Sequence, residues 1–341
     1  MRPYLYELHK NLGAKFTKFA GWDMPLEYFS ISKEVLAVRD HCGVFDISHM
    51  GRLMVSGDYK KLEYLTSRSI EALKKGRVQY NLLLNEGGGV KDDITLYKLS
   101  EWGFFLCVNA VNKDKVVDWL TFHGLDVEDV SATTLQLAVQ GPRAVEVLKK
   151  HFPVENIKYY HFEFFDNNLV SRTGYTGEDG FEVYTSLSEG AELFKELLKD
   201  CMPCGLGARD VLRIEAGMPL YGHELSEDIT PFEAGLDRFV SHGKDFMGKE
   251  ELLRRPIRKK LFGLELFKRG VPREGYPLFQ GEEQIGYVSS GTFSPSLQKG
   301  IALCFVKPPC RIEGLEVYVE LREKRMLARL RGYPFLKKLR V

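Results

Sequence analysis

Two patterns of secondary structure meet near residue 260 of this 341-residue chain, and together they limit the folds that it can adopt. In the first part, helical periodicity is present at 58–75, 112–123, 142–151 and 187–200, and short strands lie between these segments. Helices and strands that mix without strict alternation favour an α+β fold with mainly antiparallel sheets. After residue 260 the chain contains only short strands and turns, which predicts a separate all-β domain.

The composition is that of a globular protein with balanced charge. Hydrophobic residues make up 44% and charged residues 28%, and 48 basic against 47 acidic residues leave a formal net charge of +1. This length predicts two or three domains, and the balanced charge predicts no nucleic-acid partner. The chain has no apolar run of about 18 residues, and its start, MRPYLYELHKNLG, lacks the apolar core of a signal peptide. We therefore expect a cytoplasmic protein with no membrane partner.

The six cysteines and eight histidines do not follow the spacing of a disulfide framework or a metal site. Cys201 and Cys204 form a single C-x-x-C, but it follows an amphipathic helix, and no second pair lies at zinc-ligand spacing. A redox or metal role for this pair is the less favoured interpretation. The sequence predicts reduced thiols and no metal.

The stretch NEGGGVKDDITLYKL places three glycines and two adjacent aspartates at the start of a predicted strand. Because side chains alternate along a strand, Asp92 and Asp93 must point to opposite faces of the sheet. Asp92 shares its face with Ile94, whereas Asp93 shares its face with Thr95 and Tyr97, so Asp93 is the candidate for a polar pocket. The alternative is that both aspartates are turn residues that keep the end of a hairpin soluble.

Further motifs are denser in Gly, His, Arg and acidic residues than a structural role requires. They are DHCGVFDISHMGRL, RTGYTGEDGFEVY and GARDVLRIEAGMPLYGHEL. In the last of these, a helix would carry Arg209 and Arg213 one turn apart with Glu215 nearby, and the alternative is a solvated basic stripe. None of the glycine clusters has the spacing or the following helix of a nucleotide-binding loop.

Taken together, these stretches resemble one family, the tetrahydrofolate-dependent aminomethyltransferase known as the T protein of the glycine cleavage system. The resemblance starts at FAGWDMPLEY, passes through VFDISHMG, NEGGGVKDDI, RTGYTGEDGFE and ARDVLRIEAGMPLYG, and ends in IGYVSSGTFSPSL and KGIAL. It implies a cloverleaf of three domains around a central folate-binding hole. The domains are expected at 1–50 plus 140–248, at 51–139, and at 261–341 as a barrel-like β domain, with a linker at 249–260.

The resemblance also implies a reaction and the residues that perform it. An aminomethyl group on the lipoyl arm of the H protein would lose ammonia and pass its one-carbon unit to tetrahydrofolate, giving 5,10-methylenetetrahydrofolate. No metal is implied. The family's catalytic aspartate matches Asp93, and the residues that match its folate-binding positions are Tyr80, Asn109, Tyr175, Glu182 and Arg209.

Chemistry explains these residue types. A carboxylate such as Glu182 can accept the paired N–H donors on the edge of a pterin, while Arg209 can donate to the carbonyl side or pair with the acid. Asp93 would stabilise the positive charge that develops as the amine leaves, and it could accept a proton. The register that would bring Tyr80 next to Asp93 cannot be fixed from sequence.

Related proteins leave alternatives. Dimethylglycine and sarcosine dehydrogenases carry a similar folate domain fused to a flavin domain, for which this chain has neither the length nor the G-x-G-x-x-G. Folate-binding iron–sulfur-assembly proteins carry a Lys-Gly-Cys-Tyr-x-Gly-Gln-Glu stretch where this chain has RTGYTGEDG. A non-catalytic folate-binding protein, of the iron–sulfur-assembly or tRNA-modification type, stays open as the alternative. No ligand contact is assigned to Arg213, Tyr333 or Phe335.

Overall fold

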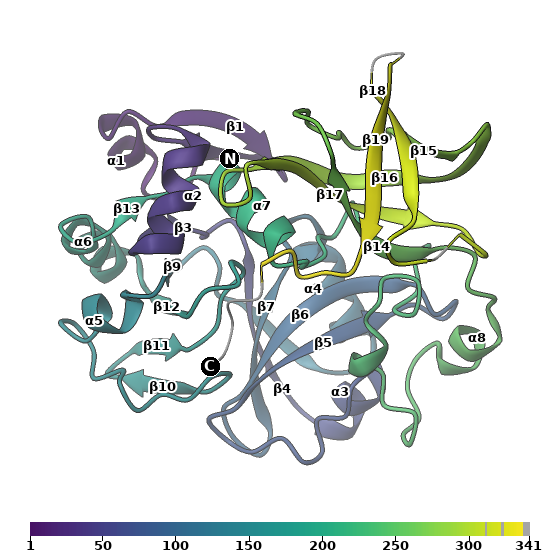
Figure 1. Ribbon diagram of the computed structural model, residues 1–341. Coiled ribbons are helices and arrows are strands. Elements are labelled where there is room, and N and C mark those ends of the chain that lie inside the picture. The colour runs from purple at the N-terminus through teal and green to yellow at the C-terminus, as the bar shows by residue number, and fades with distance from the viewer. Residues whose placement is uncertain (311, 322–323, 337–341) are drawn as a thin grey trace.

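The computed structural model describes residues 1–310, 312–321 and 324–336, and its strands form three large sheets that group around one another (Figure 1). Two are open sheets of six and five strands, and the third is a closed barrel at the C-terminal end of the chain. A two-stranded hairpin of β1 (Lys15–Phe19) and β2 (Trp22–Glu27) adds to the N-terminal part. The predicted α+β class with a C-terminal barrel is confirmed.

The six-stranded sheet is built from segments on both sides of the part of the chain that forms the five-stranded sheet. Its order is β10 (Phe162–Phe165), β11 (Asn168–Ser171), β12 (Gly180–Ser186), β9 (Thr134–Gln140), β3 (Gly43–Asp46) and β13 (Met202–Pro203). All neighbours are antiparallel except β13 and β3. The helices of this part are α1 (Tyr6–Asn11), α2 (Ile31–Asp40), α5 (Ala144–Leu148), α6 (Leu187–Leu197) and α7 (Leu206–Glu215).

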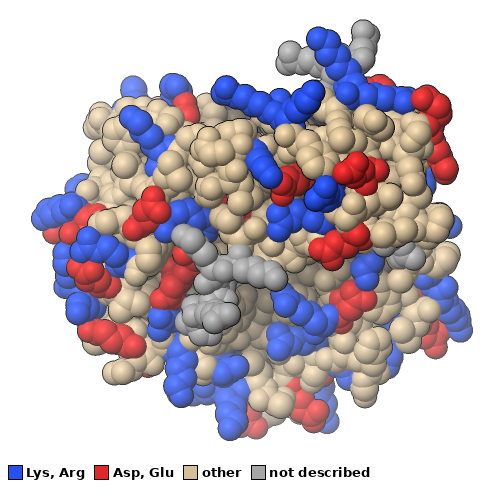
Figure 2. All heavy atoms as spheres, in the orientation of Figure 1, with Lys and Arg blue, Asp and Glu red and all other residues tan. Residues whose placement is uncertain are grey.

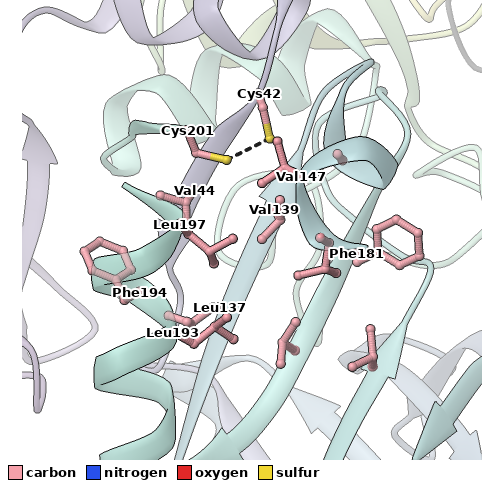
Figure 3. Packing of buried hydrophobic residues seen from close by; sticks show 14 of the residues in the cluster. Cys42, Val44, Leu137, Val139, Val147, Phe181, Leu193, Phe194, Leu197 and Cys201 are labelled. Carbon is pink, nitrogen blue, oxygen red and sulfur yellow. Dashed lines mark hydrogen bonds between the residues drawn. The ribbon is translucent and has the colours of Figure 1, made fainter. Parts of the chain in front are cut away.

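Apolar periodicity explains how α6 covers this sheet. Leu193, Phe194 and Leu197 recur at helical spacing and are buried against Leu137 and Val139 of β9 (Figure 3). The helix begins after Ser186, whose side chain accepts a hydrogen bond from the N–H of Glu189. It lies within the segment 187–200 that the periodicity predicts.

The five-stranded sheet runs in the order β5 (Val78–Leu84), β6 (Val90–Lys98), β7 (Gly103–Val108), β4 (Gly51–Ser56) and β8 (Asp126–Asp129). Its helical segments are α3 (Tyr59–Leu65), η1 (Ala110–Asn112) and α4 (Lys113–Phe122). The helix expected over 58–75 ends ten residues early, at Leu65, because Thr66 is extended and forms a β-bridge with Leu83 of β5.

Close packing explains the glycine triplet in the β5–β6 turn. Gly88 has a φ of +76°, which favours glycine, and a Cβ there would lie 2.8 Å from the backbone of Leu252. A Cβ on Gly89 would lie 1.7 Å from the carbonyl oxygen of Glu227. The glycines therefore allow both the turn and the close approach of two other segments.

The barrel closes in the order β14 (Lys260–Leu266), β17 (Lys299–Val306), β16 (Glu283–Ser294), β15 (Pro277–Gln280), β18 (Glu316–Leu321) and β19 (Lys324–Arg331). Before it come η2 (Asp237–Phe239) and α8 (Lys249–Arg254). The basic segment 249–260 was expected to be a linker, but its first half is α8. Leu252 of that helix is buried in a core shared with β5, β6 and the barrel strands, so the segment is packed rather than free.

Helix α7 connects the parts, because it packs against α2, β2 and the barrel strands β16 and β17 (Figure 1). Figure 2 shows Lys, Arg, Asp and Glu interspersed over one face of the molecule, as the balanced charge predicts. Among the described residues, every helix is too short or too polar to cross a bilayer.

Candidate active site

A cavity of about 1340 Å³ lies where the two open sheets, α7 and the barrel meet. Its walls come from β1, β5, β6, β12, α7, β16 and the loops between them. All six residues that the sequence singles out line it: Tyr80, Asp93, Asn109, Tyr175, Glu182 and Arg209. The fold thus brings together side chains that are up to 129 positions apart (209 − 80).

Asp93 presents its carboxylate to this cavity from β6. The Tyr80 hydroxyl donates to Oδ2 at 3.0 Å, and Asn109 Nδ2 donates to Oδ1 at 2.7 Å. Tyr80 pairs with Thr95 in the β5–β6 ladder, and this register lets its ring reach along the same face to Asp93. Burial raises the pKa of Asp93 above its ordinary value, and the hydrogen bonds from Asn109 and Tyr80 oppose that rise.

Asp92 lies on the opposite face, as strand alternation predicts, and its side chain is fully buried. Its Oδ1 accepts from Asn112 Nδ2 at 2.6 Å and from Asn109 Nδ2 at 2.8 Å, and its Oδ2 accepts from the backbone N–H of Asn109 at 3.1 Å. The two aspartates are therefore not solubilising turn residues. They are also not independent, because the same Asn109 amide reaches both carboxylates.

Glu182 extends from β12 into the cavity and is 8% exposed. The Thr173 hydroxyl donates to its Oε2 at 2.6 Å, and Gln136 Nε2 lies 3.5 Å from its Oε1. Burial raises the pKa of Glu182, whereas Thr173 and the charge of Arg209 oppose the rise. Oε1 is thus the less firmly held oxygen and can accept further hydrogen bonds.

Arg209 lies on the cavity side of α7 above a tyrosine. Its guanidinium carbon lies 4.8 Å from the centre of the Tyr175 ring, and the Tyr175 hydroxyl donates to the Pro219 carbonyl. The Nη1 atom of Arg209 is buried and has no hydrogen-bond partner among the described residues. A buried donor without a partner is rare in folded proteins, and it indicates a place for a ligand.

Arg213, one turn further along α7, does not belong to a solvated stripe. Its guanidinium is buried and donates to Glu224 at 2.8 Å, to Ser290 of β16 at 2.7 Å and to Asp210 at 2.9 Å. Glu215, which follows on the same helix, accepts from Arg39 of α2 at 2.7 Å. Through Arg213 and Glu215, α7 is thus joined to α2 and to the barrel strand β16.

Sequence reasoning missed His49 as a residue of the cavity wall. It is 4% exposed, its Nδ1 has no partner within the described chain, and its ring packs edge-on against Phe19 at 5.5 Å. Burial and the charge of Arg209 lower the pKa of His49 to about 3, so its imidazole is neutral. The motif DISHMGR could have indicated it. Tyr333 also lines the cavity, whereas Phe335 packs in a core next to the barrel.

The comparisons with known proteins agree with this architecture. The family model described as the GCVT N-terminal domain matches residues 5–244, and the one described as the glycine cleavage T-protein C-terminal barrel domain matches residues 259–337. The fold and its cavity thus define a class, the three-sheet proteins of GCVT type. Within that class, the chain belongs to the glycine cleavage T-protein family.

Individual relatives span nearly the whole chain. The aminomethyltransferase of Aquifex aeolicus (strain VF5) is 58% identical over 99% of this chain and 96% of its own length. The aminomethyltransferase of Geobacillus sp. (strain WCH70) is 42% identical over 99% of both chains. The crystal structure of glycine cleavage system aminomethyltransferase T from Bartonella henselae superposes with a TM-score of 0.95 at 35% identity, over 99% of this chain and 98% of the other.

Proposed function

We propose that this protein is the cytoplasmic aminomethyltransferase of a glycine cleavage system, which transfers a one-carbon unit from the aminomethyl-lipoyl arm of an H protein to tetrahydrofolate. The products would be 5,10-methylenetetrahydrofolate, ammonia and the dihydrolipoyl H protein. The enzyme class is that of its full-length relatives. The observation that carries the choice of substrate is the convergence of Asp93, Glu182 and Arg209 on one cavity.

The polar groups of the cavity fit the edge of a pterin. Glu182 Oε1 can accept an N–H of the pterin, and Arg209 Nη1, which has no partner in the described protein, can donate to the carbonyl side. Both groups lie in a buried setting where a hydrogen bond to a charged group is strong. The pterin would supply an acceptor for Arg209 Nη1, which has no partner among the described residues, and a further donor for Glu182 Oε1.

Asp93 is the proposed catalytic group. Asn109 and Tyr80 fix its carboxylate at the cavity wall, so the negative charge is in place before the reaction begins. Positive charge develops on the leaving amine, and a carboxylate at that point stabilises it and can take up a proton. Because its pKa is raised, Asp93 is a stronger base than an ordinary aspartate.

A reconstituted reaction tests this proposal. Purified protein is mixed with tetrahydrofolate and with lipoylated H protein that carries the aminomethyl group, and the released ammonia is measured. The same assay with the Asp93→Asn variant in place of the wild type is the control. We expect ammonia and methylenetetrahydrofolate in equal amounts from the wild type. Folate binding without any ammonia release would support the non-catalytic alternative.

A further inference from the structure

Two cysteines 159 positions apart meet at the edge of the six-stranded sheet. Cys42 directly precedes β3 and Cys201 directly precedes β13, the strands that pair in parallel with Met202 opposite Gly43. The N–H of Met202 donates to the Cys42 carbonyl at 3.1 Å, so the ladder continues to the cysteines. Their Sγ atoms lie 2.9 Å apart (Figure 3).

The pair lies inside the core rather than at the surface. Cys42 is 1% and Cys201 5% exposed, and both belong to the apolar cluster that contains Val44, Val147 and Leu197. Figure 3 shows the two sulfur atoms pointing at each other across the gap between their segments. Each thiol is thus held against the other.

Cys204, the other cysteine of the C-x-x-C, does not take part. Its Sγ contacts the Met202 carbonyl at 3.3 Å, and it packs in a different cluster with Val35 and Phe45. The C-x-x-C spacing in the sequence therefore does not identify the two cysteines whose thiols are in contact. The pair that meets in space combines Cys201 with Cys42.

We propose that Cys42 and Cys201 are an oxidative modification site, at which the two thiols form a disulfide that joins β13 to β3. Neighbouring strands lie about 4.7–4.9 Å apart, within the range of about 4.4–6.8 Å that a disulfide requires between Cα atoms. The oxidant is an external disulfide. One cysteine thiolate attacks it and releases a first thiol, and the second cysteine displaces the other, so two protons and two electrons leave the protein.

The bridge would close a loop that contains the whole five-stranded sheet. Such a cross-link stabilises a protein chiefly by restricting its unfolded chain, and more so for longer loops. The contact with Cys42 and burial raise the pKa of the Cys201 thiol, so it reacts slowly in the folded protein. The disulfide therefore forms while the chain folds or when the sheet edge opens.

Peptide mapping after refolding tests the proposal. The reduced, denatured protein is refolded in a buffer of reduced and oxidised glutathione, remaining thiols are blocked with N-ethylmaleimide under denaturing conditions, and the digest is analysed without reduction. We expect a linked peptide that contains Cys42 and Cys201, and a melting temperature several degrees above that of protein refolded with dithiothreitol. The Cys204→Ser variant is the matched control and should keep both results.

The Cys42→Ser variant should lose the linked peptide and the difference in melting temperature between the two buffers. If the Cys42→Ser variant does not fold, the peptide map of the refolded wild-type protein decides the proposal by itself. Complete blocking of Cys42 and Cys201 in the refolded wild type overturns the proposal. A Cys201–Cys204 bridge in place of the expected one overturns it as well.

Discussion

Helix α7 carries two arginines one turn apart, and they differ in how completely the protein pairs them. Arg213 finds acids and a hydroxyl on three sides, and these partners tie α7 to the barrel. Both arginines line the cavity, but Arg209 packs over Tyr175 and keeps one buried nitrogen without a partner among the described residues. Burying a polar group without a partner costs free energy. The pairing of Arg213 therefore indicates a structural role, whereas the unpaired nitrogen of Arg209 indicates a ligand site.

The carboxylates of the molecule divide in the same way. Glu215 and Glu224 are fully buried and accept from Arg39 and Arg213, respectively. Asp93 lines the cavity and is held by neutral donors, and no cation of the described part of the chain is in hydrogen-bond contact with it. Glu224 Oε1 has no hydrogen-bond partner among the described residues, so complete pairing alone does not distinguish the two kinds of group. What distinguishes the groups that hold the fold from those proposed to face a ligand is a hydrogen-bonded partner of opposite charge within the described residues.

The largest expected effect is on turnover at Asp93. The change Asp93→Asn keeps the shape but removes the charge and the basicity, so we expect turnover to fall by about two to four orders of magnitude while folate affinity stays within about tenfold. Ammonia release and equilibrium binding of folate measure the two quantities. Near-normal turnover in this variant would remove Asp93 from the mechanism.

Asp92→Asn is a second test rather than a neutral control. Strand alternation alone suggests that this change should leave turnover intact. In the structure, however, Asp92 accepts from the same Asn109 amide that donates to Asp93, so the variant should disturb that amide and lower turnover less than Asp93→Asn does. Equal losses in the two variants would contradict the distinction between a reacting and a positioning carboxylate.

The second largest effect is on the stability of the structural pair. Arg213→Met leaves Glu224 buried without its cation, which costs about 3–5 kcal/mol of unfolding free energy. The matched change Arg209→Met should cost clearly less, because no buried acid among the described residues loses a hydrogen-bond partner. Denaturant unfolding of the two variants compares them directly, and equal losses would remove the distinction between the arginines.

Folate affinity should show a smaller effect. Arg209→Ala and Glu182→Ala should each weaken binding by about 1–3 kcal/mol, because each removes one partner of a buried polar group. If both residues contact one edge of the ligand, the double variant should lose less than the sum of the single losses. Titration calorimetry with folate measures all three variants, and strict additivity would argue against a shared edge.

The pH dependence of stability sharpens the comparison further. Burial raises the pKa of Asp93 and of Glu182 in the ligand-free protein, so between the ordinary values and the raised ones the folded state binds more protons than the unfolded state. Stability should therefore fall as pH rises through that window. Asp93→Asn and Glu182→Gln should flatten this fall and melt at a higher temperature than the wild type at neutral pH. A steeper fall in either variant would contradict the direction of the shift.

The sequence predicts features that depend on neighbouring residues, but not contacts between segments that are far apart in the chain. Alternation along β6 correctly places Asp93 on the cavity face, and the period of α6 predicts its helix, because both depend on neighbouring residues. The link from Asp92 through Asn109 to Asp93 depends on how β6 meets the loop after β7, and His49 gains its setting from α7. Contacts between segments far apart in the chain cannot be derived from local patterns.

The smallest expected effect concerns the basic segment 249–260, which could attract an acidic lipoyl carrier towards the cavity. Arg254 lies on α8 next to Glu250 and Glu251, and Arg255 donates to the Asp228 carbonyl, so part of the positive charge is offset locally. Replacing Arg254, Arg255 and Arg258 with Ala should raise the apparent KM for H protein by a small factor that shrinks as salt is added.

The matched control for this test is a triple change elsewhere on the surface. Lys150, Lys195 and Lys199 are also exposed cations that pair with neighbouring acids, and they lie on or near α5 and α6. Their replacement with Ala lowers the net charge of the protein by the same amount. If only the general charge mattered, both triple variants would shift the KM equally, whereas local attraction predicts a shift only for the arginines of 249–260. If the salt dependence of the KM is unchanged in the arginine variant, the segment does not attract the H protein. Its role is then structural, through the packing of the buried Leu252.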